Sequence, residues 1–529
     1  MSALSTSSIS MQMPFVSTRG AVAPTMIDNA SISEDSIDQA GIDEASIDQA
    51  SIDDALIAGL APDGGLYVPA QIPQFDAQTI AAHIGSGTLA DTAAAVLAPY
   101  FVDSRLREML PMLCARAYDF DAPLVPMRGG DTHAQDFVLE LFHGPTAAFK
   151  DYAARFLAEC LVALAAEKDD ALTTPHDMIC HPERSDGPAS TDADIIEKQV
   201  PRDARDDRDD AAPDTKNDAP GRALRTTTIL VATSGDTGAA VAGAFHRRAG
   251  FNVVILYPHG RVSPRQAHGL ECWGDNVRTF RVDGSFDDCQ RMAKAALSDR
   301  DLRESMALTS ANSISLGRLL PQVAYYAHTS GAFFAAHGQA LNLIIPTGNL
   351  GNAAAAFLAK RMGLPIGEIV LATNANDVLP RYFDGGEYAP RATIATLANA
   401  MDVGAPSNFE RLRYWHRDDA QLRAAMRAFT VDDATIRATI ATAAQRHGIV
   451  PCPHTACGLH VLEGFRAAGD TRPWAVVATA HPAKFETIVE PLVGHDVPPP
   501  PALAACLARP AFGEALAADD AALRETLLG

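Results

Sequence analysis

One lysine of this sequence stands in a setting that could change its chemistry. The segment HGPTAAFKDYAARF at 143–156 predicts a Gly-Pro turn followed by a helix, with Lys150 in the first turns of that helix. Most lysines on helices are solvated surface charges. Ala147, Ala148 and Phe149 could instead shield the amine from water and lower its pKa, which a lysine needs in order to form an imine with a carbonyl compound; composition alone leaves both interpretations open.

A glycine-containing segment, TSGDTGAAVAGAF at 233–245, directly follows a strand-like run. Gly235 and Gly238 allow a tight turn, and the helix that follows would present unpaired N–H groups and its positive dipole end to an anion. Ser234 or Thr237 could instead cap this helix and bind nothing. The spacing alone leaves both interpretations open.

A second such segment, PTGNLGNAAAAFLAKRMGLP at 346–365, also follows an apolar run and opens an alanine-rich helix. Asn-Gly pairs are common in plain turns, so the GNLGN sequence is a weak signal by itself. Its position between strand and helix favours a phosphate-binding loop of backbone amides. The Gly-Lys-Ser/Thr ending of a P-loop and the full dinucleotide fingerprint are both missing.

The eight cysteines are too few for a disulfide-rich chain of 529 residues, so we expect buried free thiols. Cys452, His454 and Cys457 are close enough in sequence to suggest metal ligands. A second ligand pair with the spacing of a zinc site is missing, and we therefore predict no metal.

Apolar strand-like runs alternate with helix-like runs in most of the chain, which predicts an α/β fold with parallel sheets flanked by helices, in two such units. The glycine segments would then lie at the carboxyl edges of the sheets, where open α/β folds bind their ligands. The expected strands are 137–142, 226–232, 251–257 and 341–346, and the expected helices are 239–248 and 353–362.

Two segments interrupt this pattern. From 27 to 57 an isoleucine recurs every five residues, a period that matches neither helix nor strand. Pentapeptide repeats can form a β-helix, but these units would make fewer than about two coils, so we predict a mobile insert. The segment 167–225 is crowded with charged residues, proline and serine, which predicts a disordered, solvated linker.

Composition limits the partners. The chain is long enough for about two to four domains, and 47% hydrophobic and 20% charged residues are typical of soluble proteins. No apolar run approaches the roughly 18–20 residues of a membrane span. The net charge of −22 argues against a nucleic-acid partner. Because the N-terminal residues lack the pattern of a secretory signal, the expected compartment is the cytoplasm.

In their order along the chain, these motifs resemble those of the threonine synthase family. The likeness covers nearly the whole sequence apart from the two inserts, which makes it highly specific. Beyond the three junctions, the matching segments are STRG at 17–20, GLAPDGGLYVP at 59–69, TSANSISLGRLLPQVAYY at 309–326, ATNANDVLPRYFDGGEY at 372–388, NAMDVGAPSNFERL at 399–412 and TAHPAKF at 479–485.

The resemblance implies that Lys150 is the Schiff-base lysine of a pyridoxal 5'-phosphate cofactor, with Thr479 near the pyridine nitrogen. The residues implied for cofactor binding are Gly348, Asn349, Leu350, Gly351, Asn352, Thr479 and Asp236. Those implied for substrate binding are Ser234, Gly235, Thr237, Asn312, Ser313 and Arg318, with Arg155 as a reserve candidate for the substrate phosphate. Arg318 could equally pair with a surface carboxylate.

The resemblance also implies the fold type II architecture, in which two α/β domains face each other across the cofactor. The expected division is an N-terminal segment at 1–144, a smaller domain at 145–325 and a large cofactor-binding domain at 326–529. The implied reaction converts O-phospho-L-homoserine and water into L-threonine and phosphate by γ-elimination and β-hydration, the last step of threonine biosynthesis. We expect a monomer or a homodimer.

Two alternatives stay open. A serine/threonine dehydratase or a β-replacement enzyme of the same fold type would share the lysine and the glycine loops, but it should lack the phosphate-selective set between Asn312 and Arg318. A non-catalytic member that only binds a ligand would have lost a catalytic residue. None of the motif positions is lost.

Overall fold

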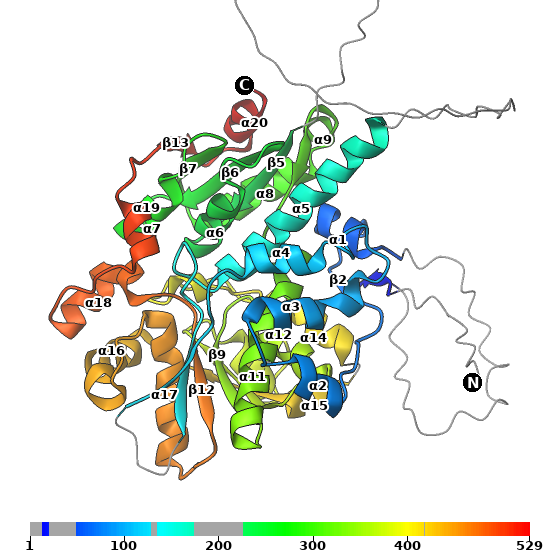
Figure 1. Ribbon diagram of the computed structural model, residues 1–529. Helices are drawn as coiled ribbons and strands as arrows, with labels where there is room; N and C mark the ends of the chain where they lie inside the picture. The colour runs from blue at the N-terminus through cyan, green and yellow to red at the C-terminus, as the bar shows by residue number, and fades with distance from the viewer. Residues whose placement is uncertain (1–12, 21–48, 129–134, 174–225, 417) are drawn as a thin grey trace, which may run out of the picture.

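The computed structural model describes residues 13–20, 49–128, 135–173, 226–416 and 418–529 of the chain. Most of the two predicted inserts lies outside these residues. The described part contains two large sheets, each with its own helices (Figure 1). The predicted α/β fold with two parallel-rich units is therefore confirmed.

The smaller sheet has five parallel strands, in the spatial order β13 (Gly513–Ala517), β7 (Val277–Asp283), β6 (Phe251–Pro258), β5 (Thr227–Ala232) and β8 (Ala307–Thr309). Its helices are α6 (Asp236–Phe245), α7 (Pro264–Glu271), α8 (Phe286–Ser298), α9 (Arg300–Ser305) and α20 (Asp520–Leu528). Alternate residues of β5 enter different clusters of buried side chains: Ile229 lies in the cluster that includes α6, and Leu230 in the one that includes α8. Burial on both faces explains why these strands read as continuous apolar runs.

The larger sheet has the spatial order β11 (Met426–Thr430), β10 (Ile366–Thr373), β9 (Leu341–Pro346), β12 (Trp474–Ala478), β4 (Asp136–Glu140) and β3 (Leu124–Pro126). All pairings are parallel except that of β3 with β4. Its main helices are α11 (Val323–His337), α12 (Gly351–Arg361), α16 (Asp433–His447) and α17 (Pro453–Ala467). Leu343 of β9 belongs to the cluster with α11 and α12, and Ile344 to the cluster with α16 and α17.

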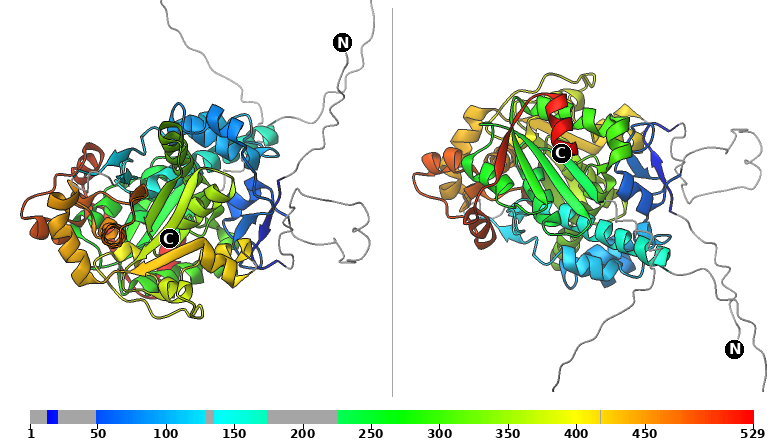
Figure 2. Two further views of the ribbon diagram at one scale, coloured as in Figure 1. Left: turned by 90° about the horizontal axis from the view of Figure 1, so that it is seen from below. Right: turned by 90° about the horizontal axis from the view of Figure 1, so that it is seen from above.

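The two large sheets contain strands from parts of the sequence that the expected domain division assigns elsewhere. Strands β3 and β4 lie within the expected N-terminal segment 1–144, yet they pair into the larger sheet. Strand β13 lies within the expected large domain 326–529, yet it pairs with β7 of the smaller sheet (Figure 2). A domain division that cuts the chain only after residues 144 and 325 misses both pairings, because strands that are distant in sequence can pair in one sheet.

The N-terminal region forms a small layer on one side of the molecule, opposite α16 and α17 in both views of Figure 2. Its elements are β1 (Phe15–Ser17), α1 (Ile52–Ala58), β2 (Tyr67–Pro69), α2 (Ala77–His83), α3 (Leu89–Leu97), η2 (Ala98–Phe101) and α4 (Leu110–Ala117). Helix α1 contains the last isoleucines of the pentad segment, so the end of the predicted mobile insert is folded. The rest of that insert lies outside the described residues.

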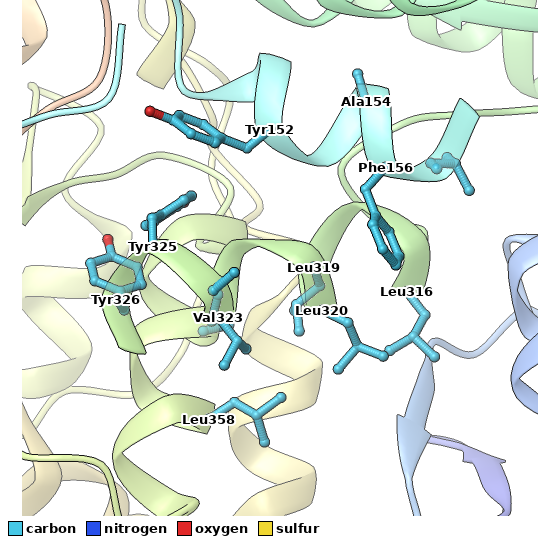
Figure 3. Packing of buried hydrophobic residues seen from close by; sticks show 14 of the residues in the cluster. Tyr152, Ala154, Phe156, Leu316, Leu319, Leu320, Val323, Tyr325, Tyr326 and Leu358 are labelled. Atoms are coloured by element: carbon cyan, nitrogen blue, oxygen red, sulfur yellow. The ribbon is translucent and has the colours of Figure 1, made fainter. Parts of the chain in front are cut away.

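The helix predicted around Lys150 is α5 (Lys150–Thr173), which begins at the lysine itself. It runs seven residues into the predicted linker 167–225, of which 174–225 are outside the described part. Tyr152 and Phe156 of α5 belong to the same buried cluster as Leu316, Leu319 and Tyr325, which follow the 309–315 loop (Figure 3). The first two turns of α5 therefore pack on this apolar core, which helps to fix the position of the helix.

The remaining short helices connect these layers. They are α10 (Leu316–Leu319), η3 (Leu320–Gln322), α13 (Val378–Phe383), η4 (Asn399–Met401), α14 (Phe409–Trp415), α15 (Asp419–Ala425), η5 (Pro482–Phe485), α18 (Glu486–Val493) and α19 (Pro501–Leu507). Within the described ranges, no helix combines the length and the hydrophobicity needed to cross a bilayer.

Candidate active site

Backbone hydrogen bonds fix the segment before Lys150 against the end of β12. The N–H of Phe149 donates to the carbonyl of Thr479 over 2.9 Å, and the N–H of His481 donates to the carbonyl of Ala147 over 3.0 Å. Ala147 has a φ of 54°, which is unfavourable for a residue other than glycine. The surrounding bonds hold this strained turn, which places Lys150 at the start of α5.

The setting of Lys150 matches the expectation of a desolvated amine. The residue is half-buried overall. Its pKa is lowered to about 8: burial of the amine is the largest cause, Asp236 opposes the shift, and the positive charges of Arg318 and Lys484 add to it. The amine therefore loses its proton much more easily than a surface lysine.

Asp236 and Lys484 form a buried ion pair beside this lysine. The Asp236 Oδ1 and Lys484 Nζ atoms are 2.7 Å apart, and both side chains are less than 5% exposed. Burial by itself would raise the pKa of Asp236, but Lys484 and Lys150 outweigh it and hold that pKa well below its ordinary value. Asp236, expected at the cofactor, is thus an ionised carboxylate engaged with a second lysine that sequence reasoning missed.

The loop from Gly348 to Asn352 forms the N-terminal end of α12. Leu350 is fully buried with a φ of 63°, and no side chain caps the helix. A methyl group at Gly348 would lie 2.7 Å from the Cα of Met401 in η4, so only glycine fits there. At Gly351 such a methyl group would be in ordinary van der Waals contact, with its nearest neighbour 3.6 Å away. The uncapped amides of this helix end suit a phosphate group.

Two asparagines of this loop use their side chains within the protein. The Asn349 amide donates to the hydroxyl of Ser313 over 2.8 Å and accepts from the N–H of Ser407 over 2.6 Å. Asn352 Oδ1 accepts from the hydroxyls of Tyr325 and Tyr326. Its buried Nδ2 has no partner among the described residues, so it is a donor available to a ligand.

The structure brings Arg318 to this site. Its side chain is 2% exposed, and its Nη1 donates to the carbonyl of Ala311 over 2.6 Å. Burial lowers its pKa to about 10, and within the described chain its Nε has no acceptor. The alternative of a surface ion pair is therefore wrong. Asn312 lies in the same loop, half-buried, and its carbonyl accepts from the N–H of Ser315.

Arg155 is not brought to the site. Its Nη2 donates to Asp119 Oδ2 and to the carbonyl of Arg116, each over 2.6 Å, and its Nε donates to the carbonyl of Ala117 at the end of α4. The guanidinium also lies over the ring of Phe120. These contacts point the side chain away from Lys150 along the outside of α5, because one helical turn and one residue rotate it off the lysine's face.

A buried arginine that sequence reasoning did not single out joins three segments around the site. Arg411 is fully buried and donates to the carbonyls of Tyr67 and Ile314 and to the side chain of Asn408. Burial lowers its pKa to about 9. Its position inside the quoted SNFERL motif was the only signal in the sequence.

The turn before α6 is capped by a residue other than the two considered. The hydroxyl of Thr233 accepts from the N–H groups of Gly235 and Gly238, each over 3.0 Å. Ser234 and Thr237 are half-buried, and neither caps the helix. Their hydroxyls remain candidates for substrate binding.

The three residues considered as metal ligands are all buried but serve other contacts. Cys457 Sγ donates to the carbonyl of Pro453, and His454 Nε2 accepts from the N–H of Ala400 over 3.1 Å. Cys452 Sγ lies 3.7 Å from His454 Nδ1. Across the described ranges, no three His, Cys, Asp or Glu side chains are grouped so that they could hold a metal ion.

The site fits the cofactor that the resemblance implies. An amine with a lowered pKa, an uncapped helix end and the unpartnered Nδ2 of Asn352 are the features that a phosphate-bearing aldehyde requires. Thr479 is close to Lys150 in space, because its carbonyl accepts a hydrogen bond from the N–H of Phe149, the residue before the lysine.

Models of three protein families match the chain. A model described as "Pyridoxal-phosphate dependent enzyme" matches residues 215–483, "Threonine synthase N terminus" matches 44–118, and "Threonine synthase, C-terminal" matches 455–527. The first of these covers just over half of the chain.

Individual relatives agree with these matches. The threonine synthase of Serratia marcescens is 32% identical over 89% of this chain and 94% of its own length. That of Escherichia coli (strain K12) is 33% identical over the same shares. The Escherichia coli crystal structure superposes with a TM-score of 0.73 at 32% identity, covering 91% of this chain and 97% of that chain. Threonine synthase of Brucella melitensis, bound to PLP, gives a TM-score of 0.74 at 31% identity, covering 98% of this chain and 99% of that chain.

Proposed function

The chain belongs to the threonine synthase family of pyridoxal-phosphate-dependent enzymes, and on this premise we propose that it converts O-phospho-L-homoserine and water into L-threonine and phosphate. The observation that carries the proposal is the environment of Lys150, a desolvated amine whose pKa is lowered further by the charges of the buried Arg318 and Lys484.

Pyridoxal phosphate, when bound, supplies an electron sink for the carbanion formed at the substrate α carbon. We assign the phosphate of the cofactor to the backbone amides from Gly348 to Asn352, helped by the Asn352 Nδ2. Thr479 is assigned to the pyridine nitrogen. Three further residues support the cofactor site without a direct contact assigned to them. Asp236 acts through Lys484, and Asn349 joins the loop to Ser313. Leu350 turns the backbone into α12.

Lys150 has two roles in the proposed mechanism. Its amine holds the cofactor, and once the substrate amine has replaced it, it removes the proton from the substrate α carbon. Both roles need an unprotonated amine near neutral pH, and burial together with Arg318 and Lys484 lowers the pKa of Lys150 to about 8. A proton must also leave the β carbon before phosphate departs from the γ carbon, and we assign the protonated Lys150 amine as the donor of the proton then added at the γ carbon.

The substrate brings a carboxylate and a phosphate to a chain with a net charge of −22. The charges around Lys150 reverse that field locally: Lys484 and Arg318 contribute two cations, and Asp236 contributes one carboxylate. We assign the substrate phosphate to Arg318, with Asn312 and Ser313, because a guanidinium can bind a phosphate through two hydrogen bonds. The substrate carboxylate is assigned to the turn formed by Ser234, Gly235 and Thr237.

The direct test measures phosphate and threonine together. Purified protein supplied with O-phospho-L-homoserine should release the two products in equal amounts, and its absorbance should show the bound cofactor. Serine and threonine, tested separately, should give little keto acid. Keto acid as the main product, with phosphohomoserine inert, would favour a dehydratase, and no turnover with any substrate would favour a ligand-binding member.

Compartment, assembly and domain division are further parts of this proposal. All seven of the described cysteines are buried free thiols, which suits the reducing cytoplasm. We propose two domains, one on each large sheet, so that 513–517 joins the smaller domain and 124–140 the larger one. A monomer or homodimer remains the expected assembly, without a nucleic-acid or membrane partner.

A further inference from the structure

The ion pair between Lys484 and Asp236 joins the two halves of the molecule beside Lys150. Asp236 is the first residue of α6, which follows β5 of the smaller sheet, and Lys484 lies in η5, which follows β12 of the larger sheet. The pair is almost completely buried, and the cavity that adjoins it measures about 10 Å³, room for no more than one water molecule. Its charges are therefore poorly screened.

Thr146 connects this pair to the lysine. The Lys484 Nζ donates to the carbonyl of Thr146 over 2.7 Å. The N–H and hydroxyl of the same threonine donate to the two carboxylate oxygens of Asp151, over 2.8 and 2.6 Å. Asp151 directly follows Lys150. All three polar groups of Thr146 therefore bind either Lys484 or the residue next to Lys150. The strained turn at Ala147 lies between these contacts.

We propose that Lys484 is a positioning residue for Lys150, which holds the 146–149 turn through Thr146 and, with Asp236, sets the charge that the Lys150 amine faces. This inference rests on the assignment of Lys150 proposed above. Neither residue of the pair needs to touch the substrate for this role.

The two members of the pair act on Lys150 with opposite signs. Lys484 repels a second ammonium and Asp236 attracts one, and the pKa of Lys150 responds to both charges. Removal of Lys484 leaves Asp236 facing Lys150 alone, so the lysine should keep its proton to higher pH. Removal of the Asp236 charge should do the reverse. A purely structural role would disturb the site without this opposition of sign.

The test follows the unprotonated fraction of Lys150 directly. Full-length protein freed of cofactor with hydroxylamine is treated with trace acetic anhydride between pH 6 and 10, and acetylation of the Lys150 peptide is measured by mass spectrometry. The wild-type midpoint should lie near pH 8. Lys484→Met should raise it by about one unit, which is a tenfold lower labelling rate at pH 7. Asp236→Asn should lower it, and Lys484→Arg should stay close to wild type because it keeps the charge.

Lys294→Met is the matched control, since Lys294 is an exposed lysine of α8. If Lys484→Met fails to fold, the double variant Asp236→Asn/Lys484→Met leaves no charge of the pair unmatched, and its midpoint must exceed that of Asp236→Asn alone. The inference is overturned if the midpoint does not rise on loss of Lys484, or if Asp236→Asn fails to lower it.

Failure of the underlying assignment gives a different result. Borohydride reduction of the cofactor-loaded protein should leave the cofactor on the Lys150 peptide. An adduct on another lysine would refute the assignment of Lys150. An adduct on Lys150 with unmoved midpoints would refute only the role of Lys484.

Discussion

The N–H of Phe149 donates to the carbonyl of Thr479 over 2.9 Å, so the residue before Lys150 is bonded through the main chain to the residue after β12. This bond, with that from His481 to Ala147, positions the lysine independently of its own side chain. Substitution of the Lys150 side chain should therefore change the chemistry of the site more than its fold.

Lys150→Ala should abolish the reducible cofactor link and lower turnover by at least about 100-fold, because no other residue of the 143–156 segment carries an amine and Lys484 is held in its ion pair with Asp236. Borohydride reduction with peptide mass spectrometry, and phosphate release, are the measurements. The melting temperature should change little. Wild-type turnover in this variant would disprove the assignment.

Arg318→Lys keeps a positive charge but loses the forked geometry of the guanidinium. We expect phosphate release from O-phospho-L-homoserine to fall roughly 10- to 100-fold in kcat/KM, with the absorbance of the bound cofactor preserved. Arg155→Lys is the control, because Arg155 pairs with Asp119 on the outside of α5 and should change activity less than about twofold. Equal losses in the two variants would argue against a substrate role for Arg318.

Gly348→Ala introduces a methyl group 2.7 Å from the Cα of Met401. Since both atoms belong to backbone segments, η4 or the loop must shift, and we expect weaker cofactor binding and a loss of about 1–3 kcal/mol in the free energy of unfolding. Equilibrium cofactor titration and denaturant unfolding measure the two effects. Gly464→Ala, on the exposed side of α17 with no atom within 4 Å, should be neutral or stabilising.

We expect the free energy of unfolding to fall in acid, because His454 is buried as a neutral imidazole. Burial lowers its pKa to about 4 from an unfolded value of 6.5, so the unfolded chain takes up the proton first. Its contribution is complete above pH 6.5 and is lost as the pH falls toward 4, by roughly 3 kcal/mol in all. His454→Gln keeps an acceptor for the Ala400 N–H and should flatten the dependence of unfolding free energy on pH in this window. His83→Gln, at an exposed position of α2, should leave it unchanged.

Much of the fold and part of the site could be predicted because they depend on local signals. The strand at 341–346 is the β9 that the structure contains, and the strands at 226–232 and 251–257 agree to within one residue with β5 and β6, because an apolar run between polar turns has few other conformations in a folded chain. The loop at 348–352 was predicted from its position between a strand and a helix, and the desolvation of Lys150 from its apolar neighbours, which are local signals as well.

Other features depend on residues that are distant in sequence. Lys484 and Asp236 lie in two quoted motifs, but no local pattern says that one will neutralise the other, or that Thr146 will bind both Lys484 and Asp151. Arg318 was likewise only preferred over the reserve candidate Arg155, because both are plausible phosphate ligands by type and only the packing shows that Arg155 pairs elsewhere.

The sequence by itself determined the family, through the resemblance of its ordered motifs, and the order of the elements, through hydrophobic periodicity within short windows. It also predicted Lys150 as the cofactor lysine. The tertiary structure alone decided which charges are buried together. An ion's free energy depends on the dielectric and on partners within a few ångströms. Those partners are brought together by the packing of two sheets, whose strands β4 and β13 come from opposite ends of the chain.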